Sequence, residues 1–189
     1  EAAAELRAVL ERGLPTIIDA DALTVLSTDG DLRELVRDHP CAVLTPHAGE
    51  FERLYAATLG RELDLSEGLG VRLRELSDAL DCFILHKGRI TTVTAPDQRI
   101  YGMNAGHSYA ATAGSGDVLS GILGATLAQL DAAEADAEAI IMEILHAAAI
   151  HQHAAAIAAH TPDGFGLCSA SQIAASVPQA IARLLLMQR

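Results

Sequence analysis

The sequence contains no tryptophan and few aromatic residues, since phenylalanine and tyrosine make up only 3% of its 189 residues. Half of all residues are hydrophobic, so alanine, leucine, isoleucine and valine must build the core. No apolar run approaches the length of about 20 residues that a bilayer-spanning helix requires. No segment shows the pattern of a signal peptide, in which a basic stretch is followed by an apolar one. We therefore predict one domain without membrane attachment, located in the cytoplasm.

Basic residues are also scarce: 13 lysines and arginines stand against 25 aspartates and glutamates, and the formal net charge is −12. This balance argues against a nucleic-acid partner, because such surfaces are usually basic. An acidic protein that binds phosphate must hold it with local devices. Helix ends, a lysine or a metal ion can serve.

Cysteines are few and histidines are scattered, which limits the metal and redox chemistry that we expect. Cys41, Cys82 and Cys168 are odd in number and lack C-x-x-C spacing, which is typical of reduced, buried thiols. The group formed by His146, His151 and His153 does not share one helical face, and no His-Glu-x-x-His motif occurs. We predict no protein-built metal site and interpret these histidines as ordinary helix residues.

The most informative segment is the glycine-rich stretch 113–117, Ala-Gly-Ser-Gly-Asp, which precedes an apolar-periodic run at 118–130. Glycines allow a tight turn and close approach of a ligand, and the helix that follows directs free N–H groups toward an anion. Asp117 stands in the first helical turn, beside any bound phosphate. The alternative is an ordinary turn with Asp117 as a cap. The segment is neither a Walker A loop nor a Gly-x-Ser-x-Gly elbow, so Ser115 is a poor candidate for a nucleophile.

Short apolar strands alternate with helical segments along the chain. We predict strands at 16–18, 41–44, 82–85, 91–94 and 99–101, the last two joined by a turn at 96–98. We predict helices at the N-terminus (with Leu6, Val9 and Leu10 on one face), at 32–37, 48–59, 66–80 (with Ser66 as N-cap), 118–130, 132–160 and 169–187, with a turn at 161–164. This order indicates an α/β fold with a mostly parallel sheet flanked by helices.

Polar residues follow the predicted strands, at the sheet edge where α/β proteins bind ligands. Asp19 and Asp21 follow the first strand, His47 the second, Lys87 the third, and Asp117 follows the hairpin. We therefore expect them to share one edge.

Each of these residues has a functional and a structural interpretation. Lys87, before Gly88, can place its ammonium on phosphate oxygens, or it is a surface lysine. His47 can bind a polar substrate, or it only begins a helix beside Glu50. Asp19 and Asp21 can hold magnesium through water or cap a turn. We favour the structural role for Asp21 and leave Asp19 open.

Several motifs together resemble one family, the ADP/ATP-dependent NAD(P)H-hydrate dehydratases of the ribokinase-like superfamily. The motifs are Asp-Ala-Asp-Ala-Leu at 19–23, Thr-Pro-His-Ala-Gly-Glu at 45–50, Lys-Gly-Arg-Ile-Thr at 87–91, the loop at 113–117 and the stretch 164–170. The loop marks only the superfamily, whereas the first two motifs together indicate the dehydratase branch. The likeness runs from about residue 14 to the C-terminus and implies a ribokinase-like three-layer sandwich.

The resemblance implies a lyase that phosphorylates the C6 hydroxyl of hydrated NADH or NADPH and eliminates phosphate, with ADP or ATP as donor and Mg²⁺. On that basis Asp117 would be catalytic and contact the substrate, and His47 would bind the substrate. The residues that would bind the nucleotide are Lys87, Gly88, Arg89, Ile90, Thr91, Gly114, Ser115 and Gly116.

The chain also departs from the family pattern. Residues 107–110 replace a Gly- and Met-containing approach to the loop, Ala113 stands where glycine is frequent, and the family's N-terminal portion has no counterpart. We therefore expect residues 1–189 to be one partial domain, with room for fusion to or pairing with an epimerase domain and for a homo-oligomer. The alternatives are a ribokinase-like small-molecule kinase and a non-catalytic nucleotide-binding module.

Overall fold

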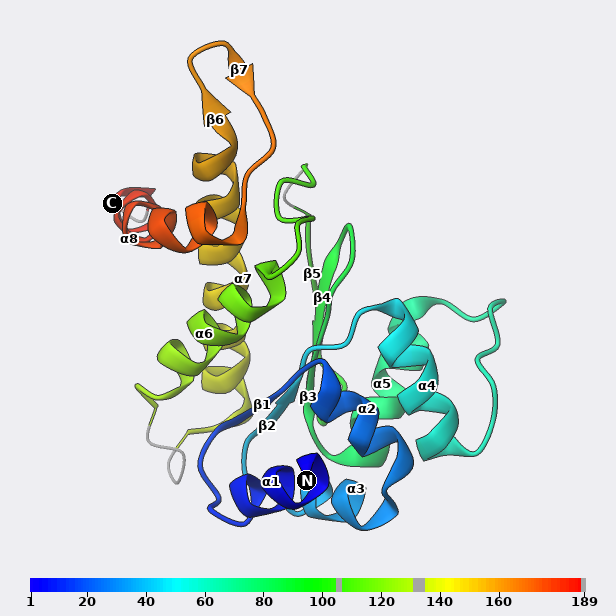
Figure 1. Ribbon diagram of the computed structural model, residues 1–189. Helices are drawn as coiled ribbons and strands as arrows, with labels where there is room; N and C mark the ends of the chain where they lie inside the picture. Colours follow the sequence, from blue (N-terminus) through cyan, green and yellow to red (C-terminus); the bar gives the residue numbers. More distant parts are fainter. Residues whose placement is uncertain (105–106, 131–134, 188–189) are drawn as a thin grey trace.

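A five-stranded mixed sheet forms the centre of the computed structural model, which describes residues 1–104, 107–130 and 135–187 (Figure 1). The strands lie in the order β1 (Thr16–Ile18), β2 (Ala42–Leu44), β3 (Phe83–His86), β4 (Thr91–Thr94) and β5 (Ile100–Met103). The pairs β1–β2 and β2–β3 are parallel, whereas β3–β4 and β4–β5 are antiparallel. The sheet is therefore less parallel than we predicted, because the expected hairpin continues the same sheet.

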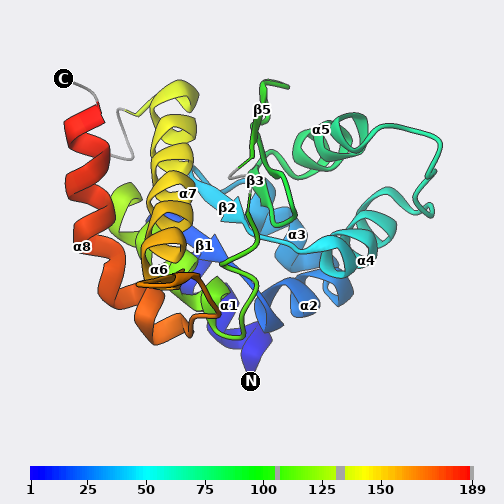
Figure 2. The same ribbon diagram turned by 90° about the horizontal axis from the view of Figure 1, so that it is seen from above.

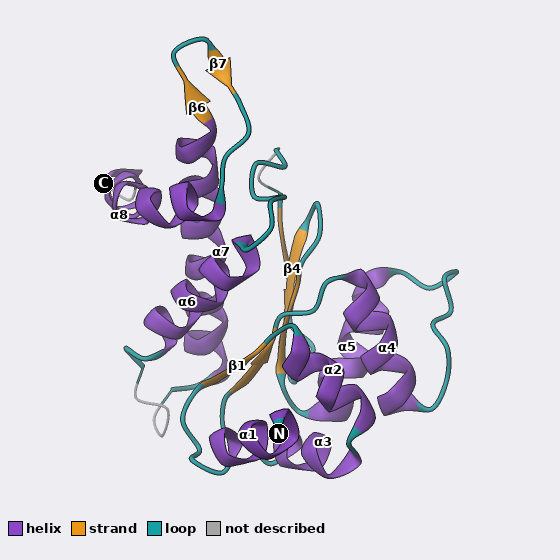
Figure 3. Cartoon of the chain, in the orientation of Figure 1, coloured by secondary structure: helices purple, strands orange, loops and turns teal. Residues whose placement is uncertain are grey.

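Helices cover both faces of this sheet, which gives three layers (Figures 2 and 3). One layer consists of α1 (Ala2–Leu10), α2 (Asp21–Thr28), α3 (Gly30–Arg37), α4 (Ala48–Leu59) and α5 (Leu69–Leu80). The other consists of α6 (Ser115–Leu127), α7 (Ala137–Ala159) and α8 (Ala170–Met187). The predicted three-layer architecture is confirmed.

The alternation of side chains along the strands explains why both faces are covered. In β2, Ala42 and Leu44 pack into the core beneath α1–α5, whereas Val43 packs into the core beneath α6 and α7. In β3, Ile84 joins the first core, and Leu85 joins the second. Because successive side chains point to opposite faces, an entirely apolar strand requires a helical layer on each side.

Helix α7 is an exception to our expectation about apolar runs. Its 23 residues are long and apolar enough to cross a bilayer by length and composition alone. In the fold, however, it packs against α6, α8 and β4, and Ile140, Ile141 and Ile144 on its stripe are buried. Alanine-rich helices of a folded core pass the same test, so this helix belongs to the second core. Its predicted start at residue 132 lies outside the described residues.

Several local predictions differ from the structure; α6, for example, spans Ser115–Leu127 where we predict a helix at 118–130. Helix α2 was not predicted, because it begins at Asp21, within the polar group that follows the strand. Helix α5 begins at Leu69 after Gly68, not after Ser66, because the Ser66 amide and hydroxyl both bond to the Asp64 carboxylate. The predicted turn at 161–164 is flanked by a small antiparallel ribbon, β6 (His160–Thr161) and β7 (Gly164–Phe165). The three cysteines are free and buried, as predicted.

Candidate active site

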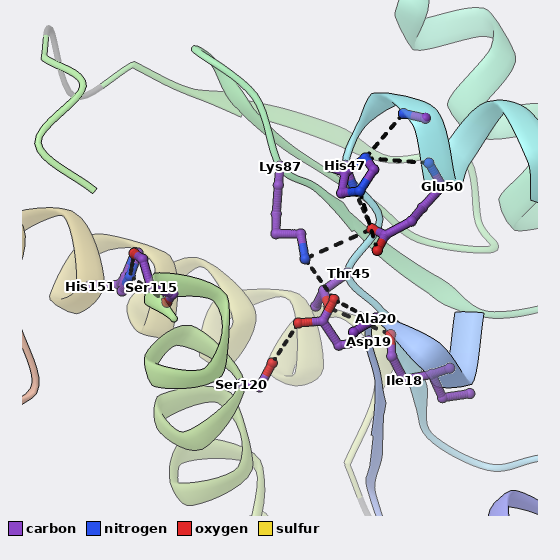
Figure 4. A network of polar contacts seen from close by, with 11 residues as sticks. Ile18, Asp19, Ala20, Thr45, His47, Glu50, Lys87, Ser115, Ser120 and His151 are labelled. Atoms are coloured by element: carbon purple, nitrogen blue, oxygen red, sulfur yellow. Dashed lines mark hydrogen bonds and ion pairs between the residues drawn. The ribbon is translucent and has the colours of Figure 1, made fainter. Parts of the chain in front are cut away.

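The parallel strands bring three polar residues to one edge of the sheet (Figure 4). Asp19 follows β1, His47 lies beyond the end of β2, and Lys87 follows β3. The Lys87 amide donates to the Pro46 carbonyl at 2.8 Å, and an isolated parallel bridge pairs His47 with Lys87. The backbone therefore fixes these two residues side by side, as the carboxyl ends of adjacent parallel strands should be.

Lys87 forms an ion pair with Asp19, the aspartate whose role the sequence left open. Its Nζ donates to Asp19 Oδ1 at 2.6 Å, and the side chains of Lys87 and Asp19 are 24% and 15% exposed. Lys87 is the only lysine in the sequence. The site therefore holds a lysine ammonium that a carboxylate keeps in place.

Asp19 is bonded from several other elements. The Ala20 amide donates to Oδ1 at 2.9 Å, and Ser120 Oγ on α6 donates to Oδ2 at 3.1 Å. Burial alone would raise the pKa of Asp19, but the Lys87 hydrogen bond and charge, with bonds from Thr45 and Ala20, lower it below its ordinary value. A carboxylate stabilised in this way joins the sheet edge to α6.

The neighbouring Asp21 has a different position. It is the first residue of α2 and is exposed. A carboxylate there is favoured by the partial positive charge of the helix N-terminus. Ala20 is the N-cap of this helix and no side-chain cap bond is formed there, so the turn-capping role that we favour for Asp21 stays a prediction.

His47 is the N-cap of α4, which supports its structural interpretation. Its Nδ1 accepts from the amides of Gly49 at 3.1 Å and Glu50 at 3.4 Å, and its own amide donates to Glu50 Oε2 at 2.8 Å. This reciprocal pair is a capping box with histidine as the cap. The His47 side chain is still 56% exposed, so the capping bonds leave much of the ring open to a ligand.

The N-terminus of α6 lies against the same ion pair. Gly114 caps the helix in the left-handed conformation, with φ of 80°, and a Cβ there would lie 3.2 Å from the Ala170 Cβ. A Cβ on Gly116 would lie 3.5 Å from Asp19 Oδ2 and 3.7 Å from Lys87 Nζ. Gly114 therefore permits the left-handed backbone that the loop requires. Because Gly116 has no side chain, the ion pair beside it stays uncovered. Asp117 is exposed in the first turn.

A buried pair that the sequence did not reveal holds the start of α6. His151 on α7 places Nε2 2.9 Å from Ser115 Oγ and 3.0 Å from the Ser115 carbonyl oxygen. Both residues are buried, and burial lowers the pKa of His151 despite the opposing bond to Ser115. A neutral imidazole therefore anchors the first turn of the helix. The sequence interpretation of His151 as an ordinary helix residue misses this pairing, because its partner is 36 residues away.

One cavity of about 820 Å³ unites these groups. Its lining includes His47, Lys87, Ser115 and Gly116, so the ammonium, the imidazole and the glycine-rich helix start converge on a shared hollow. The other lining residues are Gly88, Arg89, Thr91, His107, Ser108, Ala110, Ala111, Thr112, Leu119, His151 and Gln152.

Three of the predicted site residues are not in this lining. Ile90 is 50% exposed on the turn between β3 and β4, Gly114 turns the backbone behind the helix start, and Asp117 is exposed beside the cavity. The structure therefore brings most of the predicted nucleotide-binding residues into one place. It leaves the Asp117 carboxylate at the surface of the helix end.

Comparisons with known proteins agree with the motifs. The family model described as NAD(P)H-hydrate dehydratase matches residues 1–174. A bifunctional NAD(P)H-hydrate repair enzyme of Corynebacterium glutamicum is 40% identical over 201 aligned positions, which cover 97% of this chain and 34% of the relative. An ADP-dependent (S)-NAD(P)H-hydrate dehydratase of Neisseria meningitidis is 40% identical over 115 positions, which cover 61% of this chain and 38% of the relative. The chain thus spans about a third of the length of the curated relatives it matches.

Solved structures support the fold. A ribokinase-like superfamily protein of Enterococcus faecalis superimposes with a TM-score of 0.69 at 23% identity, covering 95% of this chain and 57% of that chain. An ADP/ATP-dependent NAD(P)H-hydrate dehydratase of Bacillus subtilis, co-crystallised with ATP and Mg²⁺ and soaked with CoA, gives 0.66 at 23% identity, covering 89% and 56%. The predicted ribokinase-like fold is confirmed.

Proposed function

Since the chain belongs to the NAD(P)H-hydrate dehydratase family, we propose that it carries out ADP- or ATP-dependent dehydration of hydrated NADH or NADPH. In this lyase reaction the nucleotide's terminal phosphoryl group passes to the C6 hydroxyl. Phosphate then leaves with a proton from the neighbouring ring carbon, which restores the reduced nicotinamide. The observation that carries the proposal is the single cavity shared by Lys87, His47 and the start of α6.

The nucleotide phosphates would occupy the region between Lys87 and the first turn of α6. Gly116 leaves room for close approach there, and helix N–H groups and the ammonium supply positive charge. Gly88, Arg89 and Thr91 would line the rest of the nucleotide, and Ser115 would be held in place by His151. Asp19 would position Lys87, because its carboxylate already bonds the ammonium at 2.6 Å.

Asp117 would act on the hydroxyl of the hydrated cofactor. Its carboxylate stands exposed in the same first helical turn as Gly116, so it can orient the hydroxyl beside the transferring phosphoryl group and accept its proton. A loose phosphoryl-transfer transition state asks mainly for positioning and charge stabilisation. His47, which keeps an exposed ring above α4, would contact the nicotinamide half of the substrate.

Magnesium fits this site only with few protein ligands. Within 1–104, 107–130 and 135–187, no three histidine, cysteine or carboxylate side chains gather around a metal position. Mg²⁺ commonly keeps water and phosphate ligands with one or two carboxylates, so Asp117, or Asp19 through water, would be enough. The ion would supply neutralisation of phosphate charge.

The longer relatives suggest a further partner. The Corynebacterium glutamicum relative is described as bifunctional and is about three times as long as the matched region. We infer that this domain works in the cytoplasm, joined to or paired with an epimerase domain that interconverts the hydrate epimers.

The deciding assay supplies hydrated NADH with ADP or ATP and Mg²⁺ and follows the absorbance of the reduced nicotinamide. We expect Asp117→Asn to lower turnover by about 100-fold or more, as loss of a positioned general base does, with nucleotide affinity retained. Asp31→Asn is the matched control, because Asp31 is an exposed acid in the first turn of α3. It should change neither quantity.

Two results would overturn the proposal. Phosphorylation of another alcohol without recovery of reduced nicotinamide would identify a small-molecule kinase. Nucleotide binding without any turnover, equal in wild type and Asp117→Asn, would identify a non-catalytic module.

A further inference from the structure

Four rings form a stack beside the cavity, and the function proposed above gives them no role. We call His107, Tyr109, Phe165 and His160 the aromatic stack. His107 and Tyr109 have ring centroids 4.4 Å apart at 20°, and Tyr109 lies 5.1 Å from Phe165 at 13°. His160 meets Phe165 edge-on at 5.5 Å. Two of these rings come from a chain with only three tyrosines and three phenylalanines, so the stack is a concentrated feature.

The aromatic stack joins two segments that are distant in sequence. The loop after β5 supplies His107 and Tyr109, and the ribbon β6–β7 supplies the other two rings (Figure 1). Tyr109 packs on the α7–α8 core, and the Cys168 thiol donates to the Tyr109 carbonyl at 3.3 Å. Phe165 nevertheless remains 61% exposed. The rings are therefore fixed from behind without being buried.

His107 is the member of the stack that reaches the cavity. It lines the same hollow as Lys87 and Gly116, whereas Tyr109 and Phe165 are not in the lining. Tyr109 covers one face of the imidazole, and His107 belongs to the cavity lining. Burial, with a smaller effect of His153, lowers the pKa of His107 and so favours the uncharged ring. A flat, uncharged and supported ring is suited to another flat ring.

We propose that the nucleobase of the bound nucleotide stacks on His107, with Tyr109 and Phe165 fixing the imidazole from behind. This inference rests on the nucleotide binding proposed above. If Lys87 and the start of α6 hold the phosphates, the base must contact other residues of the cavity. Any base presents a π-face, and stacking on aromatic side chains contributes substantially to binding. A pocket of this size can enclose both parts of a nucleotide.

The test compares ADP with tripolyphosphate, an anion that has no base, by calorimetry on the full chain. We expect His107→Ala to weaken ADP binding about tenfold, the loss typical of one stacked ring, and to leave tripolyphosphate affinity unchanged. His107→Phe should restore ADP affinity, because it keeps a flat ring. His146→Ala, an exposed histidine on α7, is the matched control and should leave both affinities unchanged. Thermal unfolding of each variant verifies the fold.

The outcomes separate this inference from the proposed function. If wild type binds ADP and His107→Ala binds it equally well, the base lies elsewhere and only the stacking inference fails. Equal weakening of ADP and tripolyphosphate would also overturn it, because His107 would then act only by shaping the loop. If wild type binds no adenine nucleotide, the proposed function itself fails and the stacking inference with it.

Discussion

Replacing Lys87 with methionine should lower the free energy of unfolding by about 2 kcal/mol, between the values for surface and fully buried ion pairs. The estimate follows from the partial exposure of both side chains and the 2.6 Å contact. Methionine keeps the aliphatic part of the side chain, so the change removes mainly the charge. Asp19 would retain its bonds from Ala20 and Ser120, which keeps the loss below that of a wholly unpaired buried charge.

Urea unfolding at pH 7 measures this loss, and a double-mutant cycle isolates the pair. Asp19→Asn and the double variant complete the cycle, in which the double variant should lose less than the sum of the two single losses. Arg53→Met is the matched control, because it removes an exposed cation from α4 and should change stability by less than about 0.5 kcal/mol. Strict additivity of Lys87→Met and Asp19→Asn would refute the reasoning, since it would mean that the contact carries no energy.

The same pair has an acid signature. Because Lys87 holds the pKa of Asp19 below its ordinary value, the stabilisation is complete above the unfolded pKa of about 3.9 and is lost as pH falls toward the folded value. The wild-type chain should therefore lose stability below about pH 4 more steeply than Lys87→Met does.

Three further predictions follow from the site and the core. Gly116→Ala adds a methyl group beside the ion pair, and the free energy of unfolding should change by less than about 1 kcal/mol. Calorimetry should show that ADP binds about tenfold more weakly, which corresponds to one weakened charged hydrogen bond. His151→Ala should cost about 1–3 kcal/mol in thermal or urea unfolding, since it leaves a buried serine without its partner, whereas the exposed His146→Ala on the same helix should cost little. Burial lowers the pKa of His39 and His86, so the unfolded chain binds more protons than the folded chain. The free energy of unfolding should therefore fall as pH drops through about 6.5, by at most about 1.4 kcal/mol per pH unit for each histidine. A flat urea midpoint between pH 7.5 and 5.5 would contradict the last of these.

Local patterns were enough to predict the strands and the edge that holds the site. An apolar run of three or four residues identifies a buried strand, and the polar residue after it must lie at the strand's carboxyl end. For that reason His47 and Lys87 could be expected at one edge of the sheet before the fold was known. Helix α6 could be expected from the glycines before it and the apolar period within it.

Contacts between distant elements could not be predicted in this way. The pairing of Ser115 with His151 depends on how α6 and α7 cross, which neither helix encodes in its own period. The partnership of Asp19 with Lys87 depends on the order of the strands, and 68 residues separate the two. The N-cap of α5 was also ambiguous in the sequence. The Ser66 hydroxyl donates to the Asp64 carboxylate, and Gly68 is the N-cap instead.

The solitary ammonium of this chain has a practical consequence. Within residues 1–189, reagents that acylate amines have one side-chain target, and it stands on the wall of the cavity. The amine reacts when it is free of its ion-pair partners, so the rate of labelling reports how often Lys87 leaves the Asp19 and Glu50 carboxylates. Mass spectrometry of the intact chain can thus measure how often the Lys87 ion pair opens, without an engineered probe.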